Sequence, residues 1–163
     1  MEYKMKDTLS IASIATNDIT EYLTNRDSIL KVINVEDNKY CQIKDIDLII
    51  IDKNFKASTI EIKGDTYHHT GNYFFEIVSN TVKNTEGCFL YTEAKYIFYY
   101  FIHIRELHIL KTNIVREWFL NNIKRFPSYF TRTIVNQNSY NTEGKLVPIH
   151  IVSREIGNTK III

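Results

Sequence analysis

The sequence contains few of the residues that break a chain into parts or crosslink it. Among its 163 residues are two prolines, five glycines and two cysteines. No proline- or glycine-rich stretch marks a linker, so the sequence predicts a single domain over residues 1–163, long enough to bury a core without crosslinks. Cys41 and Cys88 are too few for a disulfide framework or a zinc site, and two buried or partly buried thiols in a reducing compartment are expected.

Long apolar runs are also lacking. The most apolar stretch, residues 96–104, is much shorter than the roughly 20 residues that a membrane-spanning helix needs. No apolar run of signal-peptide length follows the N-terminus, so we expect a cytoplasmic protein with no membrane partner. The sequence has no glycine-rich phosphate loop, no Gly-x-Ser-x-Gly motif and no Cys-x-x-Cys pair, and an organic cofactor is therefore not expected.

Charges of both signs are present, but they are distributed unevenly. The net charge is +1. Residues 1–100 hold 11 Lys and Arg against 15 Asp and Glu, whereas residues 101–163 hold 9 against 4. An acidic half that gathers divalent metal beside a basic half that follows phosphates suits a metal-dependent nuclease, although such asymmetry is also common by chance.

Hydrophobic periodicity predicts an α/β fold in which a central mixed β-sheet is flanked by helices. Apolar residues at helical spacing predict a helix over residues 17–33, with Asp18 and Glu21 as its capping box. A second amphipathic helix is predicted over residues 113–123, with Thr112 as its N-cap. Strands are predicted over residues 40–52, 58–64, 74–78, 88–91, 96–104 and 146–152.

The most informative segment is the pair of strands that carries Asp47 and Glu61. Side chains alternate between the two faces of a strand, so Asp45 and Asp47 are expected on one face, and Glu61 and Lys63 point together on the next strand. If the strands pair as a hairpin, these charges converge where buried residues are expected. Gathered carboxylates repel one another unless a cation compensates, and carboxylate oxygens suit Mg²⁺ or Mn²⁺.

Asp47, followed 14 positions later by Glu61-Ile62-Lys63, resembles the signature of the PD-(D/E)XK nuclease superfamily. That signature is an Asp on one strand and, after a short hairpin, Glu-x-Lys on the next. The family's proline is absent, because Ile46 precedes Asp47. The resemblance implies a restriction-endonuclease-like fold and Mg²⁺- or Mn²⁺-dependent hydrolysis of DNA. It also implies metal ligation by Asp47, Glu61 and the carbonyl oxygen of Ile62, with Lys63 as a catalytic residue.

Other residues are candidates for supporting roles. Family members often carry an additional acidic residue on the first helix, for which Glu21 is the candidate. Asp45 either binds the metal directly or hydrogen-bonds nearby, and Glu76 is a candidate from a later strand. The residues expected to contact nucleic acid, each with a plain surface position as the alternative, are Tyr73, Lys124, Arg125 and Arg132.

The sequence leaves the biological role open. With little chain outside the predicted catalytic core, structure-selective cutting, as in Holliday-junction resolvases, or a role in restriction is expected, and either would use a homodimer to cut two strands. The main alternative is a non-catalytic nucleic-acid- or protein-binding module that keeps the fold, against which the intact Asp47, Glu61 and Lys63 argue. A third reading is an unrelated α/β domain whose hairpin carries these charges by accident. The sequence does not distinguish DNA from RNA.

Overall fold

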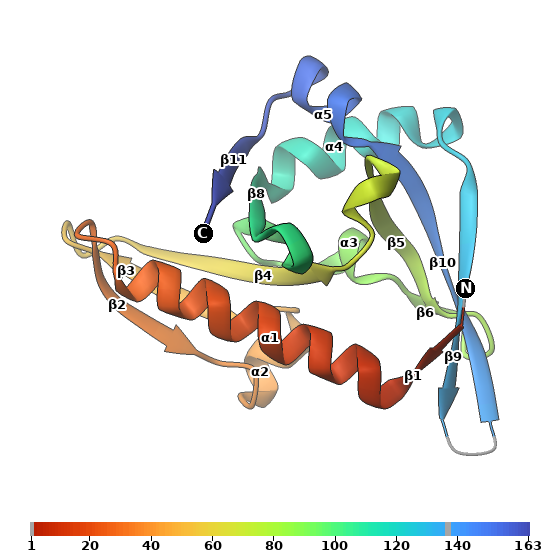
Figure 1. Cartoon of the computed structure of the whole chain (residues 1–163), viewed down its shortest axis with the longest axis horizontal. Coiled ribbons are helices and arrows are strands. Elements are labelled where there is room, and N and C mark those ends of the chain that lie inside the picture. Colours follow the sequence, from red (N-terminus) through yellow and green to blue (C-terminus); the bar gives the residue numbers. More distant parts are fainter. Residues whose placement is uncertain (1, 136–137) are drawn as a thin grey trace.

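Two β-sheets and a long N-terminal helix build the structure (Figure 1). The computed structural model describes residues 2–135 and 138–163, with side chains described for residues 9–134 and 139–163. The larger sheet, here called the main sheet, has the strand order β11-β8-β7-β4-β3-β2. Its strands are β2 (Ile29–Asn34), β3 (Leu48–Asp52), β4 (Ala57–Asp65), β7 (Tyr96–Phe101), β8 (Glu106–Lys111) and β11 (Thr159–Ile162).

The main sheet is mixed, because β4 and β7 run parallel whereas its other neighbouring strands pair antiparallel. Helices pack on both of its faces. The predicted α/β class, with a mixed sheet flanked by helices, is therefore confirmed. The helices are α1 (Met5–Thr24), α2 (Lys39–Ile43), α3 (Cys88–Tyr91), α4 (Thr112–Asn122) and α5 (Ile149–Glu155), with short 3-10 turns η1 (His68–Thr70), η2 (Ile102–Ile104) and η3 (Ile123–Arg125).

A second sheet, in the order β1-β9-β10-β5-β6, was not anticipated from the sequence. Its strands are β1 (Glu2–Lys4), β5 (Asn72–Asn80), β6 (Thr85–Glu86), β9 (Ser128–Val135) and β10 (Asn138–Pro148). Aromatic residues of β5, such as Tyr73 and Phe75, pack with Tyr99 and Phe101 of β7, so this sheet covers one face of the main sheet. The second sheet therefore covers the face of the main sheet on which Glu61 and Lys63 of β4 lie.

The long helix α1 covers the other face of the main sheet. Its residues Ala15 and Ile19 pack against Ile60 and Ile62 of β4. Gly64 lies under the helix, where a Cβ atom would come within 3.0 Å of the Ala15 side chain. Figure 1 shows α1 running along the main sheet on the side away from α4. Each strand of the hairpin thus has a helix-facing side and a side that faces the second sheet.

The predicted first helix is partly wrong. Helix α1 ends at Thr24, and residues 29–34 form strand β2, which pairs with β3. Residues 29–34 are rich in β-branched side chains, and pairing with β3 outweighs the helical spacing of their apolar positions. Asp18 and Glu21 consequently lie inside α1 and form no capping box; Asp18 instead accepts a hydrogen bond of 2.7 Å from the Tyr100 hydroxyl.

Several element boundaries also differ from the prediction. Residues 39–43 form a short helix whose first turn is capped by Asn38, so the strand predicted over 40–52 begins only at Leu48. Residues 88–91 are helical, and the last predicted strand ends at Pro148, where α5 begins. Thr112 is the first residue of α4, and Lys111 occupies the N-cap position.

The elements around the expected site are confirmed. Strand β4 includes the predicted 58–64, and it pairs antiparallel with β3 as a hairpin. The strand predicted over 74–78 lies within β5, and the helix predicted over 113–123 corresponds to α4. Of the helices that the structure describes, none is long and apolar enough to cross a membrane.

Candidate metal centre

The β3–β4 hairpin places Asp47 beside the Glu-x-Lys strand. The Asp47 backbone N–H donates to the carbonyl oxygen of Ile60 at 2.9 Å, and the Asp47 Oδ2 accepts the backbone N–H of Ile62 at 2.7 Å. The β3–β4 ladder extends no further toward the C-terminus of β4 than the Leu48–Ile60 pair, so the Asp47 carboxylate takes the place of the next rung. Because the N–H and C=O of a strand residue point to the same edge, the carbonyl oxygen of Ile62 also faces this edge.

Glu61 and Lys63 point together, as the alternation of β4 predicts. The Lys63 Nζ lies 3.0 Å from the Glu61 Oε1, and only 3% of Glu61 is exposed. Their cross-strand neighbours on β7 are Ile97 and Tyr99, which belong to the core beneath the second sheet. The Oε2 of Glu61 is buried and has no hydrogen-bond partner among the described residues. One oxygen of the Glu61 carboxylate is thus paired with the Lys63 ammonium, and the other has no hydrogen-bond donor among the described residues.

Asp45 reaches the same place by a route that alternation does not predict. It lies in the turn between α2 and β3, where its φ of 54° is in the left-handed region that Asp tolerates better than most residues. Its carbonyl oxygen accepts the Thr92 hydroxyl at 2.7 Å, which fixes the turn against the segment after α3. Its Oδ1 accepts the Tyr91 hydroxyl at 3.4 Å, whereas its Oδ2 is buried without a partner in the part of the chain that the structure describes.

Cys88 completes a cluster that the sequence did not reveal. Ligand atoms of Asp45, Glu61 and Cys88 all lie within 4.8 Å of one another. Cys88 is the first residue of α3, and it follows Gly87, whose missing Cβ would lie 2.4 Å from the Glu76 carbonyl oxygen. The glycine therefore allows α3 to start directly against β5. Nothing in the spacing from Glu61 to Cys88 signals this approach, because it depends on how the β5–α3 segment folds back over β4.

Glu76 enters the cluster from the second sheet. A cavity of about 10 Å³, roughly the space for one water or ion, lies between β4 and β5. Its lining combines Glu61, Lys63, Glu76 and Cys88 with aromatic rings, among them Phe74, Phe75, Phe89 and Tyr99. Glu76, predicted as a supporting residue, lines the same cavity as Glu61 and Lys63. Charged groups therefore share a small space with apolar walls, where their interactions are poorly screened.

The electrostatics of the cluster show an excess of negative groups. Burial raises the pKa of Glu61 well above its ordinary value, and Asp47 and Asp45 raise it further against the opposing effect of Lys63. Burial also raises the pKa of Asp47, although the Ile62 N–H and the neighbouring Glu61 carboxyl act in the opposite direction. Burial alone lowers the pKa of Lys63, but Cys88, Glu61 and other acidic neighbours raise it well above its ordinary value. Lys63 is therefore held as a cation and does not balance the acidic groups alone.

Glu36 supplies the additional acidic group near Asp47, whereas Glu21 does not contact the cluster through any described interaction. Glu21 is exposed on α1. Glu36 raises the pKa of Asp47 and is held by the Thr16 hydroxyl of α1 at 2.9 Å and by the Asn34 side-chain amide at 2.8 Å. The sequence analysis missed Glu36, because finding it requires recognising residues 29–34 as a strand next to β3.

The predicted nucleic-acid contact of Tyr73 is wrong. Tyr73 is fully buried, and its hydroxyl lies 2.6 Å from His108 Nδ1 and 2.8 Å from the Asn158 side-chain amide. An aromatic residue in an apparently polar segment is no guide to exposure when the neighbouring residues form a strand covered by a second layer. Tyr73 is therefore part of the core.

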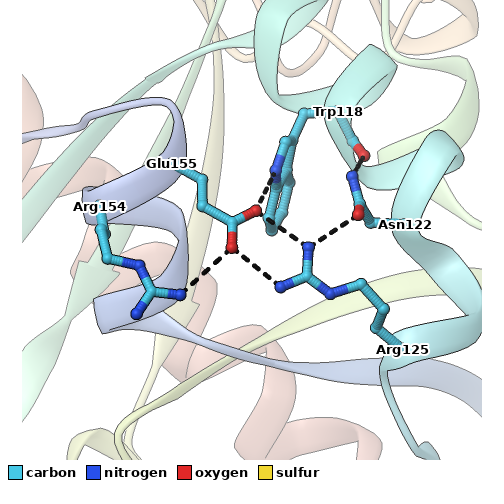
Figure 2. A network of polar contacts seen from close by, with 5 residues as sticks. All are labelled: Trp118, Asn122, Arg125, Arg154 and Glu155. Atoms are coloured by element: carbon cyan, nitrogen blue, oxygen red, sulfur yellow. Dashed lines mark hydrogen bonds and ion pairs between the residues drawn. The ribbon is translucent and has the colours of Figure 1, made fainter.

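The three basic candidates are exposed, and two of them have intramolecular partners. Arg125 donates to both oxygens of Glu155 at 2.9 Å, and the same carboxylate accepts the Trp118 indole N–H, as Figure 2 shows. Arg132 donates to the Ser139 hydroxyl at 3.0 Å. Lys124 is exposed in η3. The Arg125 network ties α4 to α5, so this arginine has a structural role whether or not it meets a phosphate.

Comparisons of the chain with protein-family models, with curated proteins and with solved structures found no match.

Proposed function

We propose that the chain is a nuclease that hydrolyses DNA phosphodiester bonds with a divalent metal ion, Mg²⁺ or Mn²⁺, bound at the cluster around Asp47 and Glu61. The observation that carries the proposal is the buried Oε2 of Glu61, which lacks a hydrogen-bond partner among the described residues while Asp45 and Asp47 stand close by. A buried carboxylate in this state costs free energy that a bound cation would offset.

The chain's own groups supply the parts that phosphodiester hydrolysis needs. Asp47 and Glu61 would hold the ion, together with the Ile62 carbonyl oxygen on the same strand edge. Lys63, held as a cation beside Glu61, would orient the attacking water or stabilise charge developing on the phosphate. The ion, when bound, lowers the pKa of water and neutralises phosphate charge. Water attacks phosphorus and the bond to the 3′ oxygen breaks, leaving a 5′-phosphate and a 3′-hydroxyl.

The resemblance of Asp47 and Glu61-Ile62-Lys63 to the PD-(D/E)XK signature supports the same reaction. The antiparallel β3–β4 hairpin agrees with the arrangement that the signature requires. Structure-selective or restriction-type cutting is the proposed activity, and a homodimer would place two sites on a duplex. Exposed basic residues such as Lys124 and Arg132 are the proposed phosphate contacts.

A second candidate is a non-catalytic module that keeps the fold and binds nucleic acid or protein. The observation that favours it is burial: Glu61 is 3% exposed, and the adjoining cavity of about 10 Å³ does not admit a phosphodiester without movement of the walls. In this case the Lys63–Glu61 pair would be a closed structural ion pair.

The proposal is tested by cleavage of labelled linear, single-stranded, nicked and four-way-junction DNA, and of an RNA of the same sequence, with Mg²⁺ or Mn²⁺. Glu61→Gln and Lys63→Ala should lose cleavage. Glu21→Gln and Lys83→Ala change the same residue types at exposed positions and should retain it.

The substrate that is cut fastest would identify the subclass and decide between DNA and RNA. Failure of the folded wild type to cut any substrate would reject the nuclease and favour the binding module. Cleavage that persists in Glu61→Gln would place the active site elsewhere.

A further inference from the structure

We propose that Cys88 is a ligand of the metal site, with Asp45 and Glu61, and that the site therefore prefers a first-row transition ion such as Zn²⁺ or Co²⁺ over Mg²⁺. This inference rests on the proposed metal centre and specifies which ion it takes. Neither the PD-(D/E)XK signature nor the spacing of the motif includes a thiol.

The distances suit a single ion. Ligand atoms of Asp45, Glu61 and Cys88 lie within 4.8 Å of one another. Carboxylate oxygens bind such ions at about 2.0–2.2 Å and thiolate sulfur binds at about 2.3 Å, so two ligand atoms of a tetrahedral ion lie about 3.3–3.7 Å apart. Side-chain movements of up to about 1 Å would bring the three atoms onto one centre.

The carboxylate oxygens without hydrogen-bond partners indicate a ligand independently of the distances. Asp45 Oδ2 and Glu61 Oε2 are both buried without a hydrogen-bond partner within the described part of the chain. Glu61 and Cys88 are 3% and 5% exposed, so water does not readily satisfy them. The hydrogen bonding of this cluster of two carboxylates and a thiol is therefore incomplete. A bound cation would satisfy the two carboxylate oxygens.

A cation also reduces the excess of negative charge in the cluster. A divalent ion together with Lys63, whose Nζ lies 3.0 Å from Glu61, offsets the three negative charges of Asp45, Glu61 and Cys88 once the thiol proton has passed to solvent. Asp47, whose Oδ2 accepts the Ile62 N–H, keeps the place that the proposed function gives it. Asp45, Glu61 and Cys88 thus leave further positions on the ion for Asp47 and for water or a phosphate oxygen.

The chemistry of sulfur decides the choice of ion. Mg²⁺ binds oxygen ligands and accepts thiolate poorly, whereas Zn²⁺ and Co²⁺ bind thiolate, imidazole and carboxylate. A site with one sulfur among its ligands should therefore bind Co²⁺ much more tightly than Mg²⁺, and replacing the sulfur with a hydroxyl should narrow that difference.

The probe is Co²⁺, because a thiolate ligand gives a sulfur-to-cobalt charge-transfer band in the near ultraviolet. The wild type titrated with Co²⁺ should develop this band, and an excess of Mg²⁺ should not remove it. Cys41→Ser changes the other thiol, which is packed near Ile46 and Ala94, and leaves Cys88 as the only cysteine. This variant should keep the band. Cys88→Ser should lose it and bind Co²⁺ at least about tenfold more weakly.

The outcomes separate this inference from the proposed function. Co²⁺ binding without the band in the wild type and in Cys41→Ser would show that Cys88 is not a ligand, while Mg²⁺-dependent cleavage, if found, would leave the nuclease standing. Loss of the band in Cys41→Ser would assign the band to the Cys41 thiol and overturn the inference. Binding of no divalent ion, with no cleavage, would reject both. Since Cys41→Ser alone assigns the band, the test does not depend on Cys88→Ser folding.

Discussion

Two buried polar clusters lie on the same face of the main sheet, and they differ in whether their hydrogen bonds are complete. Lys63, Tyr99 and His108 are paired across β4, β7 and β8, so the metal cluster and the His108 cluster stand on either side of Tyr99. Around His108, Nδ1 meets the Tyr73 hydroxyl at 2.6 Å and Nε2 meets Glu106 at 2.7 Å. Each imidazole nitrogen thus has a partner.

The His108 cluster continues outward to further partners. The Glu106 carboxylate lies 2.8 Å from the Lys160 ammonium, and the Asn158 amide donates to the Tyr73 hydroxyl. The metal cluster instead keeps two buried carboxylate oxygens, from Asp45 and Glu61, without partners in the described residues. A complete network stabilises the fold by itself, whereas an incomplete one depends on something that the chain does not supply. The comparison therefore separates a cluster whose polar atoms are satisfied within the chain from one whose polar atoms are not.

The largest expected difference is in catalysis. Glu61→Gln should reduce single-turnover cleavage at least about 10³-fold, roughly 4 kcal/mol of activation free energy, because it removes a proposed metal ligand. Tyr73→Phe, in the other cluster, should stay within about threefold of the wild type once its folded fraction is matched. Equal losses in the two variants would show that the clusters do not differ in function.

The next difference is in stability, and it runs the opposite way. His108→Ala should lower the free energy of unfolding by about 2–4 kcal/mol, because it leaves a cavity and strips Tyr73 and Glu106 of a partner. Asp45→Asn should cost much less than this, since it removes a charge that repels its neighbours. Urea unfolding without divalent ions measures both values, and a cost below about 1 kcal/mol for His108→Ala would contradict the structural role of its cluster.

A smaller effect concerns pH and Glu61. Its raised pKa means that the folded chain binds more protons than the unfolded chain, so the cost of burying the charge is absent below the ordinary value of 4.5 and grows as the pH rises toward the folded pKa. Without metal, Glu61→Gln should therefore be more stable than the wild type at neutral pH. The difference should vanish near pH 4. Unfolding measured across this range tests the sign, and a destabilised variant at neutral pH would refute it.

The smallest effect is expected in the exposed Arg125–Glu155 network (Figure 2). Hydrogen bonds from Arg125 and Trp118 lower the pKa of Glu155 to about 2. The network's contribution to stability is therefore present above the ordinary value of 4.5 and is lost as the pH falls toward 2. Trp118 is the only tryptophan, so its fluorescence should change in this window. Glu155→Gln should remove this change in fluorescence. A variant whose fluorescence titration matches that of the wild type would show that the change does not arise from Glu155.

The sequence was sufficient for the parts of the site that depend on local pattern. Alternation along β4 correctly placed Glu61 and Lys63 together, and the β-branched runs correctly predicted the hairpin that brings Asp47 to them. These relations depend on neighbours within about 15 positions, where strand periodicity and a short turn determine the geometry.

The sequence did not predict the parts that depend on distant segments. Asp45 joins through a left-handed turn, and Cys88 joins because Gly87 allows α3 to pack against β5. Tyr73 was mistaken for a surface residue because the second sheet, formed largely by β5, β9 and β10, was not foreseen. Such contacts are set by tertiary packing between segments far apart in the chain, for which hydrophobic periodicity carries no signal.

The central claim is that the buried oxygens of Asp45 and Glu61 bind a divalent cation. Thermal unfolding with and without Mn²⁺ tests it most directly. At about 100 times its dissociation constant, a cation that binds only the folded state stabilises it by about 2.7 kcal/mol. The wild type and Tyr73→Phe should each gain roughly 5–10 °C in their unfolding midpoints, and Glu61→Gln should gain almost nothing. No gain in the wild type, or an equal gain in Glu61→Gln, would contradict the metal centre.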